Sequence, residues 1–275
     1  MDESQKKEIQ ERVIAPFIEK TRRDCVKIHW QQTDCTLTDS KVGGKPYFPE
    51  EAIYPIVYVG ENAGRPLKFL AQINFAQMPP LKGFPLSGLL QFFVLDDDAI
   101  GLDFDNPENQ NHFRVLYYDS VSPYDPQGEI PSNVDNMEWV GCFPINDELK
   151  MTFEKTSMPL TVCDFRFEES FMAQYREAFP ETEENSFWEL PDDVLDLVDE
   201  QLSAGGSRIG GYSFFMQNDP REYGTGKDKT VQLLQIDSDH PDILWGDCGV
   251  ANFLIRPDDL DALDFSEVLY TWDCC

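Results

Sequence analysis

An internal repeat constrains the fold of this chain more than any other feature of its 275 residues. Four segments recur in the same order roughly 160 residues further along the chain, and such self-similarity indicates a repeated structural unit. We therefore expect a duplicated unit at about residues 41–124 and 208–275. The matched segments are KVGGKPYF (41–48) with RIGGYSFF (208–215), LKFLAQINF (67–75) with VQLLQIDSD (231–239), SGLLQFFVL (87–95) with CGVANFLIR (248–256), and FRVLYYD (113–119) with FSEVLYTWD (265–273).

Each repeat unit is expected to be rich in β-strands. A glycine pair opens the unit, and apolar and aromatic runs separated by turn residues follow it. The runs LLQFFVL and ANFLI are almost continuously apolar, which is typical of strands covered on both faces. We predict an α+β fold dominated by β-structure. In it, two repeated mixed β units related by pseudo-twofold symmetry share one core, with flanking helices. The segment 151–167 indicates a further strand.

Helices are expected outside the repeats. Residues 5–22 carry an apolar stripe of helical period, with Pro16 as a kink or interruption. A helical insert at about 165–205 separates the two units, with helices predicted at 168–179 and 191–203. We expect one domain over residues 1–275.

The repeat segments also resemble a known family. GGKPYFP, RPLKFLAQINFAQMP and FPLSGLLQFFV, followed by LLQIDSD and ILWGDCGVANFLI, are similar to the YwqG-like proteins, a bacterial domain-of-unknown-function family. The resemblance covers about residues 10–275. It implies a cytoplasmic single-chain protein of mixed, β-rich fold, and it implies no enzyme activity, cofactor or catalytic residue.

The charge of the chain is strongly negative. The 22 Lys and Arg residues against 51 Asp and Glu residues give a formal net charge of −29 at pH 7. Such a surface repels phosphate backbones and anionic lipids, so we expect neither nucleic acid nor a membrane as partner. The N-terminus has no apolar signal sequence, and the seven cysteines form no CxxC pair. We therefore expect free thiols and a cytoplasmic location.

A search for catalytic and metal-binding motifs finds none that is complete. The tract 224–227 (GTGK) fails as a phosphate loop because Asp228 follows the lysine, and no GxSxG elbow is present. The three histidines are too dispersed for a metal cluster. The acidic tract at 96–98 leaves two alternatives open, weak calcium binding and a solvated acidic loop. We expect no catalytic residue, no metal site and no cofactor.

The repeated glutamines are the most interesting polar positions. If the two units meet at a twofold axis, the two amides approach each other there. In one interpretation each glutamine pairs buried backbone groups; in the other, a polar cleft between the units binds a ligand. The candidate ligand-binding residues are Gln72, Asn74, Gln235, Asp237, Trp245 and Asp247.

Two functions follow from these observations. The first is a non-catalytic binding or interaction protein, a monomer whose acidic surface neutralises a basic protein partner. The alternative is a small-molecule or metal-binding sensor or enzyme with its site in the cleft between the two repeats.

Overall fold

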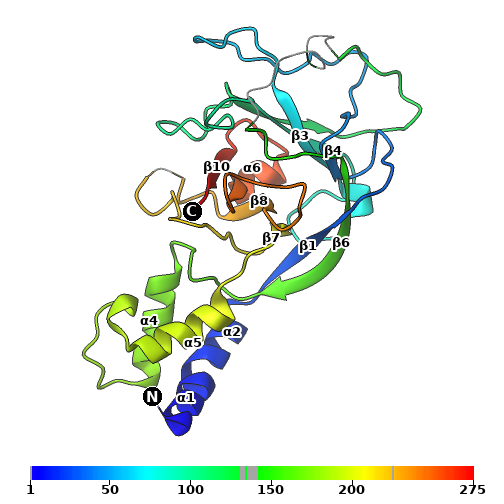
Figure 1. Ribbon diagram of the computed structural model, residues 1–275. Helices are drawn as coiled ribbons and strands as arrows, with labels where there is room; N and C mark the ends of the chain where they lie inside the picture. The colour runs from blue at the N-terminus through cyan, green and yellow to red at the C-terminus, as the bar shows by residue number, and fades with distance from the viewer. Residues whose placement is uncertain (1, 131–133, 135–141, 225) are drawn as a thin grey trace.

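The computed structural model describes residues 2–130, 134, 142–224 and 226–275. Its dominant element is one antiparallel sheet of ten strands in the order β10-β9-β8-β7-β1-β6-β2-β3-β4-β5, shown in Figure 1. The strands are β1 (Arg23–Gln31), β2 (Lys41–Val42), β3 (Lys68–Asn74), β4 (Leu89–Val94), β5 (Phe113–Tyr118), β6 (Leu149–Met158), β7 (Arg208–Gly210), β8 (Val231–Asp237), β9 (Val250–Ile255) and β10 (Leu269–Asp273).

The long strands β1 and β6 form the middle of the sheet and pair antiparallel over their whole length. β2, β3, β4 and β5 continue from β6 in chain order, and we call them the first wing; β7, β8, β9 and β10 continue from β1 in chain order as the second wing. Each matched segment of the sequence thus supplies a strand at the same place in its wing. The ladders β3–β4 and β8–β9 also shift register at matched points, between Phe69 and Ala71 and between Gln232 and Leu234.

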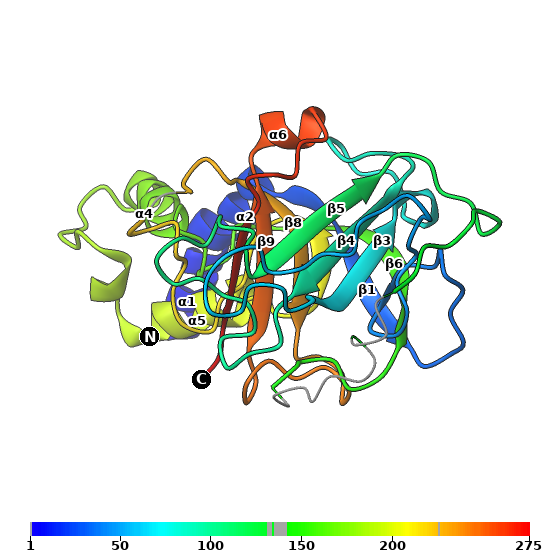
Figure 2. The ribbon, with the colours of Figure 1, turned by 90° about the horizontal axis from the view of Figure 1, so that it is seen from above.

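The sheet curls until it is nearly closed, so that the inner faces of the two wings enclose one apolar core (Figures 1 and 2). The rings of Phe92 in the first wing and Phe253 in the second have centroids 4.6 Å apart, and Phe253 stacks on Tyr270. The Tyr270 hydroxyl donates to the carbonyl of Ile100 at 2.8 Å. The apolar runs identified in the sequence therefore meet inside the sheet, where both wings exclude water together.

The wings are also joined by a buried cation. The side chain of Lys229, before β8, is fully buried. Its ammonium donates to the carbonyl of Glu267 at 2.6 Å and lies 3.3 Å from the carboxylate of Glu108, in the loop before β5. An unpaired buried charge is very costly. The ammonium of Lys229 therefore favours the arrangement in which the segment of Glu267 and the loop of Glu108 stay together.

The single turn Phe75–Gln77 follows β3, and the short α6 (Pro257–Asp261) lies beside β10. The other helices gather at one end of the molecule, at the bottom of Figure 1. They are α1 (Glu3–Ile9), a π-helical turn (Gln10–Ile14), α2 (Ala15–Thr21), α4 (Phe167–Ala178) and α5 (Asp192–Leu202), with a single turn at Phe187–Glu189. Their apolar stripes form a second core with Met158, Leu160 and Tyr212.

The N-terminal α-helix is interrupted just before Pro16, where the sequence predicted a kink or interruption. Proline has no backbone N–H, so the regular α-helical bond to the fourth preceding carbonyl cannot form there. The chain takes a π-helical turn just before it, in which the N–H of Ala15 donates to the carbonyl of Gln10. The predicted strand at 151–167 is too long, because β6 ends at Met158, directly before Pro159.

A small group of buried ion pairs links the insert to the second wing. The guanidinium of Arg221, 1% exposed, lies 2.6 Å from the carboxylate of Asp219 and 3.3 Å from that of Asp164. Asp164 also binds Arg166 at 2.6 Å. These arginines have the carboxylate partners that buried cations require.

The cysteines differ from the expectation of free thiols. Cys248 and Cys275 form a disulfide with Cα atoms 6.4 Å apart, while Cys25, Cys35, Cys142, Cys163 and Cys274 are free. Because the cysteines are scattered in sequence without a CxxC pair, only the fold brings this pair together. No helix in the described part of the chain is long and apolar enough to cross a membrane.

We predict that Phe253→Ala destabilises the fold by about 3–5 kcal/mol, because it leaves a cavity between the wings. The matched control is Phe104→Ala, since Phe104 is 80% exposed and should cost less than about 0.5 kcal/mol. Chemical denaturation of both variants measures the difference. Equal effects of the two substitutions would contradict a core shared between the wings.

Candidate functional site

The amide of Gln72 is fully buried in β3 and binds backbone groups of its own wing. Its oxygen accepts from the N–H of Tyr47 at 3.1 Å, and its nitrogen donates to the carbonyls of Leu37 and Asp39, both at 2.7 Å. The neighbouring Gln91 in β4 donates to the carbonyl of Tyr47 at 2.6 Å. Two side-chain amides therefore hold the N–H and the carbonyl of one residue, just after the first glycine pair.

The second wing repeats this arrangement. The oxygen of Gln235 accepts from the N–H of Phe214 at 2.8 Å, and its nitrogen donates to the carbonyl of Gly206 at 2.7 Å. Asn252 in β9 donates to the carbonyl of Phe214 at 2.9 Å. Each glutamine thus pairs buried backbone groups that would otherwise cost about 1–3 kcal/mol each. Within the described chain no hydrogen bond joins Gln72 to Gln235, whose strands are separated by β2, β6, β1 and β7.

Asn74 and Asp237 end the same two strands and also bind their own wing. The backbone N–H groups of Asn74 and Asp237 donate to the hydroxyls of Ser40 and Ser207, at 2.9 and 3.0 Å. The Asp237 carboxylate accepts from the N–H groups of Gly206 and Ser238. Burial raises the pKa of Asp237, and nearby Asp239 adds to this, while the two N–H groups oppose it.

The remaining two candidate residues lie before β9. Trp245 is fully buried beside Trp272, with ring centroids 6.1 Å apart. Its backbone N–H donates to the Ser238 hydroxyl at 2.9 Å, while its indole N–H has no hydrogen-bond partner among the described residues. Asp247 is exposed in the following turn. The six candidates are therefore spread over the ends and interiors of two distant strands and one turn. Their role in ligand binding stays a prediction.

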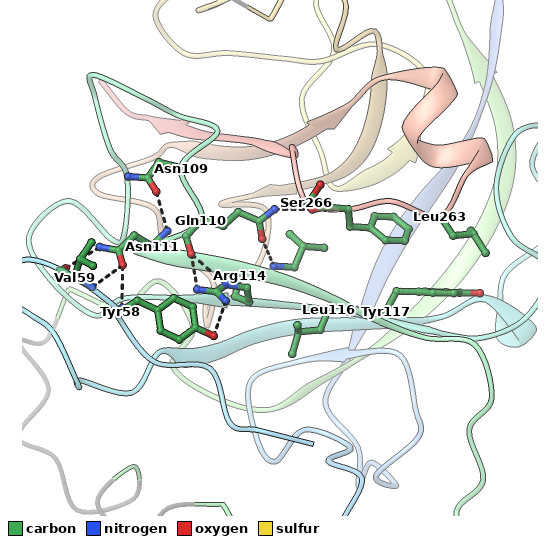
Figure 3. A pocket seen from close by; sticks show the side chains of 12 residues that line it. Tyr58, Val59, Asn109, Gln110, Asn111, Arg114, Leu116, Tyr117, Leu263 and Ser266 are labelled. Carbon is green, nitrogen blue, oxygen red and sulfur yellow. Dashed lines mark hydrogen bonds between the residues drawn. The ribbon is translucent and has the colours of Figure 1, made fainter. Parts of the chain in front are cut away.

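A pocket that the sequence did not indicate lies between the outer strand β5 and the segment that leads into β10 (Figure 3). It encloses about 660 Å³, which is in the range of ligand and peptide sites. Its lining residues come from three parts of the chain: Tyr58 and Val59; Asn109, Gln110, Asn111, Arg114, Val115, Leu116 and Tyr117; and Leu263, Phe265 and Ser266.

Two polar residues before β5, Gln110 and Asn111, hold the walls of this pocket in place. The oxygen of Gln110 accepts from the N–H of Val115 at 2.8 Å, and its nitrogen donates to the carbonyl of Phe265 at 2.5 Å. The oxygen of Asn111 accepts from the N–H groups of Tyr58 and Val59, which fixes the opposite wall (Figure 3). In the sequence, the three consecutive amide side chains at 109–111 are the one feature that marks this pocket. Without the fold they are indistinguishable from an ordinary polar loop.

Strand β5 is an edge of the sheet at this pocket. Because the Val115 N–H bonds to Gln110 rather than to β4, and because strand residues alternate, Val115 and Tyr117 direct their backbone groups away from the sheet. In the part of the chain that the structure describes, nothing binds the N–H or carbonyl of Tyr117 or the carbonyl of Val115. The other outer strand is partly covered, since the N–H of Tyr270 donates to the carbonyl of Pro107.

Arg114 is the one charged residue among those lining the pocket. Its guanidinium lies 4.5 Å from the ring centre of Tyr58 and donates to the Tyr58 hydroxyl and to the Gln110 carbonyl. The exposed residues Glu61, Asp119 and Asp264 lie within two positions of lining residues along the chain. The pocket therefore has apolar and aromatic walls, open backbone groups and one cation, with carboxylates close to it in sequence.

The described residues contain no group of three or more His, Cys, Asp or Glu side chains arranged to hold a metal ion. In the acidic tract, Asp96 is buried beside the ammonium of Lys68, at 3.4 Å. Asp97 accepts from the N–H of Gly101, which closes a turn. These two carboxylates therefore serve the local fold.

Comparison with known proteins places the chain in a family. Residues 40–274 match the family model of a domain of unknown function, DUF1963. The chain belongs to this family. The DUF1963 match includes both wings and the helical insert, and the YwqG-like resemblance of the sequence is consistent with a family of unknown function. No curated protein matches the chain.

We predict that Gln72→Leu destabilises this DUF1963 domain by about 2 kcal/mol or more, because it leaves buried backbone groups without partners. Gln235→Leu should act in the same way, whereas Gln32→Leu, at an exposed position, should have little effect. Urea unfolding followed by circular dichroism measures these differences. A stable Gln72→Leu variant would show that the amide is not needed for the fold.

The carboxylate of Asp39 should make stability depend on pH. Burial favours a raised pKa, but the Thr36 N–H, the Gln77 amide and the Lys150 ammonium outweigh it and lower the pKa from 3.8 to about 2. Because the folded pKa is the lower one, this contribution is present above the unfolded pKa and is lost as pH falls from 3.8 towards 2.

Asp39→Asn should therefore lower the free energy of unfolding by about 2 kcal/mol at neutral pH, and by progressively less as the pH falls below 4. Asp34→Asn, at an exposed position, is the control. Unfolding curves between about pH 2 and pH 7 test this, and parallel curves for Asp39→Asn and the unmodified protein would contradict it.

Proposed function

We propose that this chain is a non-catalytic binding protein that holds an extended, basic segment of a partner protein along the open edge of β5. The observation that carries the proposal is the set of three backbone groups at the pocket that bind nothing in the described chain: the carbonyl of Val115 and the N–H and carbonyl of Tyr117. An extended peptide that adds to a sheet edge gains hydrogen bonds to such groups, and its alternating side chains enter the walls on either side.

The walls suit a strand with apolar side chains. Tyr58 and Val59 form one wall, exposed by 61% and 66%, and Leu263 with Phe265 forms the other. Large exposed apolar residues in one place are typical of interaction sites. An uncovered edge strand is also a hazard for aggregation, so a partner that occupies it would remove a liability.

Charge selects a basic partner. The net charge of −29 attracts a cationic protein and accelerates its encounter, and the exposed carboxylates of Glu61, Asp119 and Asp264 lie close in sequence to lining residues. The same charge repels nucleic acid. It also opposes self-association, so we propose a monomer. The cytoplasmic location is proposed from the sequence; the Cys248–Cys275 disulfide is more typical of an oxidising compartment.

For the fold, we propose that the wings descend from one duplicated segment and are related by a pseudo-twofold axis through the β1–β6 pair. Three features support this: the same strand order outward from that pair, register shifts at matched positions, and matched amide contacts to Tyr47 and Phe214. The glycine pairs at 43–44 and 210–211 also share positive φ angles, from 65° to 71°.

The peptide proposal is tested with a labelled peptide, Lys-Lys-Val-Thr-Val-Thr-Val-Lys-Lys, and its analogue with Glu in place of Lys. We expect the lysine peptide to bind and the affinity to fall with added salt. Tyr117→Pro removes the open N–H without breaking a bond to β4, since prolines are tolerated at such edge positions. Fluorescence anisotropy should show binding roughly tenfold weaker than for Tyr117→Ala.

Tyr117→Ala is the matched control because both variants lose the ring and its hydroxyl contact to the Ser87 carbonyl. Circular dichroism checks that each variant is folded. Equal affinities of the two variants would contradict strand addition at β5. Equal binding of the Glu and Lys peptides would contradict a basic partner.

A further inference from the structure

A second pocket, separate from the β5 edge, lies where α2 leads into β1 and meets the second glycine pair. It encloses about 470 Å³. One side is formed by Arg22, just before β1, with Arg23 and Asp24 at its start. Another side is formed by Gly210, the last residue of β7, and by Gly211. The loop at 81–84 in the first wing and residues 230–232 in the second complete it.

The charge of this pocket is opposite to that of the protein. Its lining contains three cationic side chains, Arg22, Arg23 and Lys82, and one carboxylate, Asp24. In the chain as a whole, acidic residues outnumber basic ones by 51 to 22. A local surplus of positive charge in such a chain attracts an anion that the rest of the surface repels.

Arg23 is held in place but has no carboxylate partner. Its guanidinium lies 4.3 Å from the ring centre of Tyr212 and donates to the carbonyl of Thr230 at 3.2 Å. In the described part of the chain no carboxylate lies within ion-pair distance of it, unlike the nearby Arg166 and Arg221. Burial lowers the pKa of Arg23 and these two guanidiniums add to the effect, while Tyr212 and the more distant carboxylate of Asp164 oppose it. The arginine has five N–H donors, so most remain available to a ligand.

The second cation, Lys82, is exposed at the pocket, and the described residues offer it no ion pair. Arg22 is also exposed and lies 3.7 Å from Glu19, a weak surface pair. An anion could therefore be contacted by a fixed guanidinium from one side and by mobile side chains from the other. Arginine and lysine together are typical of sites for carboxylates and phosphates.

Apolar residues form a second part of the lining, beside the polar Thr230 and Gln232. Leu81 and Phe84 are buried beneath the pocket, and Val231 and Pro257 line it further out. A Cβ atom at Gly210 would lie 2.6 Å from Leu81, and one at Gly211 would lie 2.6 Å from Met158. Both glycines also have a φ of 71°, which disfavours other residues. The backbone of Gly210 thus comes close to Leu81, and no side chain at this position fills the pocket.

The pocket at the first glycine pair carries a different set of charges. Gly43 and Gly44 lie beside Asp147 and Glu148, which directly precede β6. The corresponding place in the second pocket, at the beginning of β1, is taken by Arg22 and Arg23. Glu148 forms an ion pair with the buried Lys41 at 2.8 Å. The excess of cationic over acidic side chains is therefore found at the second glycine pair and not at the first.

We propose that the pocket of Arg23, Lys82 and the second glycine pair binds a small organic anion, with a carboxylate or phosphate on an apolar body. The anionic group contacts Arg23 and Lys82, and the apolar body covers Leu81 and Phe84. This site is independent of the peptide edge at β5. The chain then has two binding sites of opposite charge, one for a basic segment and one for an anionic small molecule.

The test uses four probes on the full chain: phenyl phosphate, benzoate, inorganic phosphate and benzylamine. Isotope-labelled protein reports binding through the backbone amide signals of Gly210, Gly211 and Thr230. We expect phenyl phosphate or benzoate to shift these signals in the millimolar range or below. Inorganic phosphate should bind more weakly because it lacks the apolar body, and benzylamine should not bind. The order of the two aromatic anions distinguishes a phosphate site from a carboxylate site.

Two variants locate the anionic group. Arg23→Gln should weaken binding of the better aromatic anion roughly tenfold, and Lys82→Gln several-fold. Lys45→Gln removes the same charge at the first glycine pair and should leave binding unchanged. Lys82 is exposed and can be replaced without loss of the fold, so its result counts even if Arg23→Gln is unstable.

Three results would overturn the proposal. The first is that neither aromatic anion shifts these amide signals at about 10 mM, because a site with a weaker dissociation constant than this is negligible. The second is that benzylamine binds as tightly as the anions, and the third is that Lys82→Gln and Lys45→Gln have equal effects. Inorganic phosphate binding as tightly as phenyl phosphate would overturn the apolar part of the site.

Discussion

The structure depends on the burial of two apolar strand faces against each other inside one curled sheet. Phe92 and Phe253 come from different wings, and neither wing alone could keep its inner face from water. The rest of the sheet follows from this contact, since the β1–β6 pair must bend far enough to bring β4 and β9 together. The buried ammonium of Lys229 strengthens the same closure, because it needs groups from both wings.

The sheet does not close completely, so β5 and β10 remain as its outer strands, and their exposed edges differ. The loop at Pro107 partly covers β10, whereas the backbone groups of Tyr117 in β5 open into a pocket. The polar side chains inside the sheet have another task. Gln72 and Gln235 bind backbone groups near the glycine pairs, so the most regular polar feature of the sequence maintains the fold. The pockets instead use residues that the repeat does not share, such as Arg114 and Arg23.

Several local features could be predicted from the sequence, because they depend on neighbours along the chain. The apolar stripe at 191–203 became α5, and the runs at 89–94 and 250–255 became strands buried on both faces. The interruption predicted at Pro16 took the form of a π-helical turn. The predicted strand at 151–167 was too long for an equally local reason, because the strand that begins at Leu149 ended before Pro159. The disulfide of Cys248 and Cys275 could not be predicted, because cysteine spacing does not determine pairing.

The sequence by itself determined the strand segments, the recurrence of similar motifs along the chain and the acidic character of the protein, since these depend on residue order, apolar period and a count of charges. Only the tertiary structure decided which strands meet, which edge stays open and which cations lack partners. Strand pairing across the sheet joins residues far apart in the chain, and a pocket depends on groups that approach only after the sheet has curled. Arg23 and Lys82 are ordinary basic residues in the sequence, and the fold places them beside the same glycine pair.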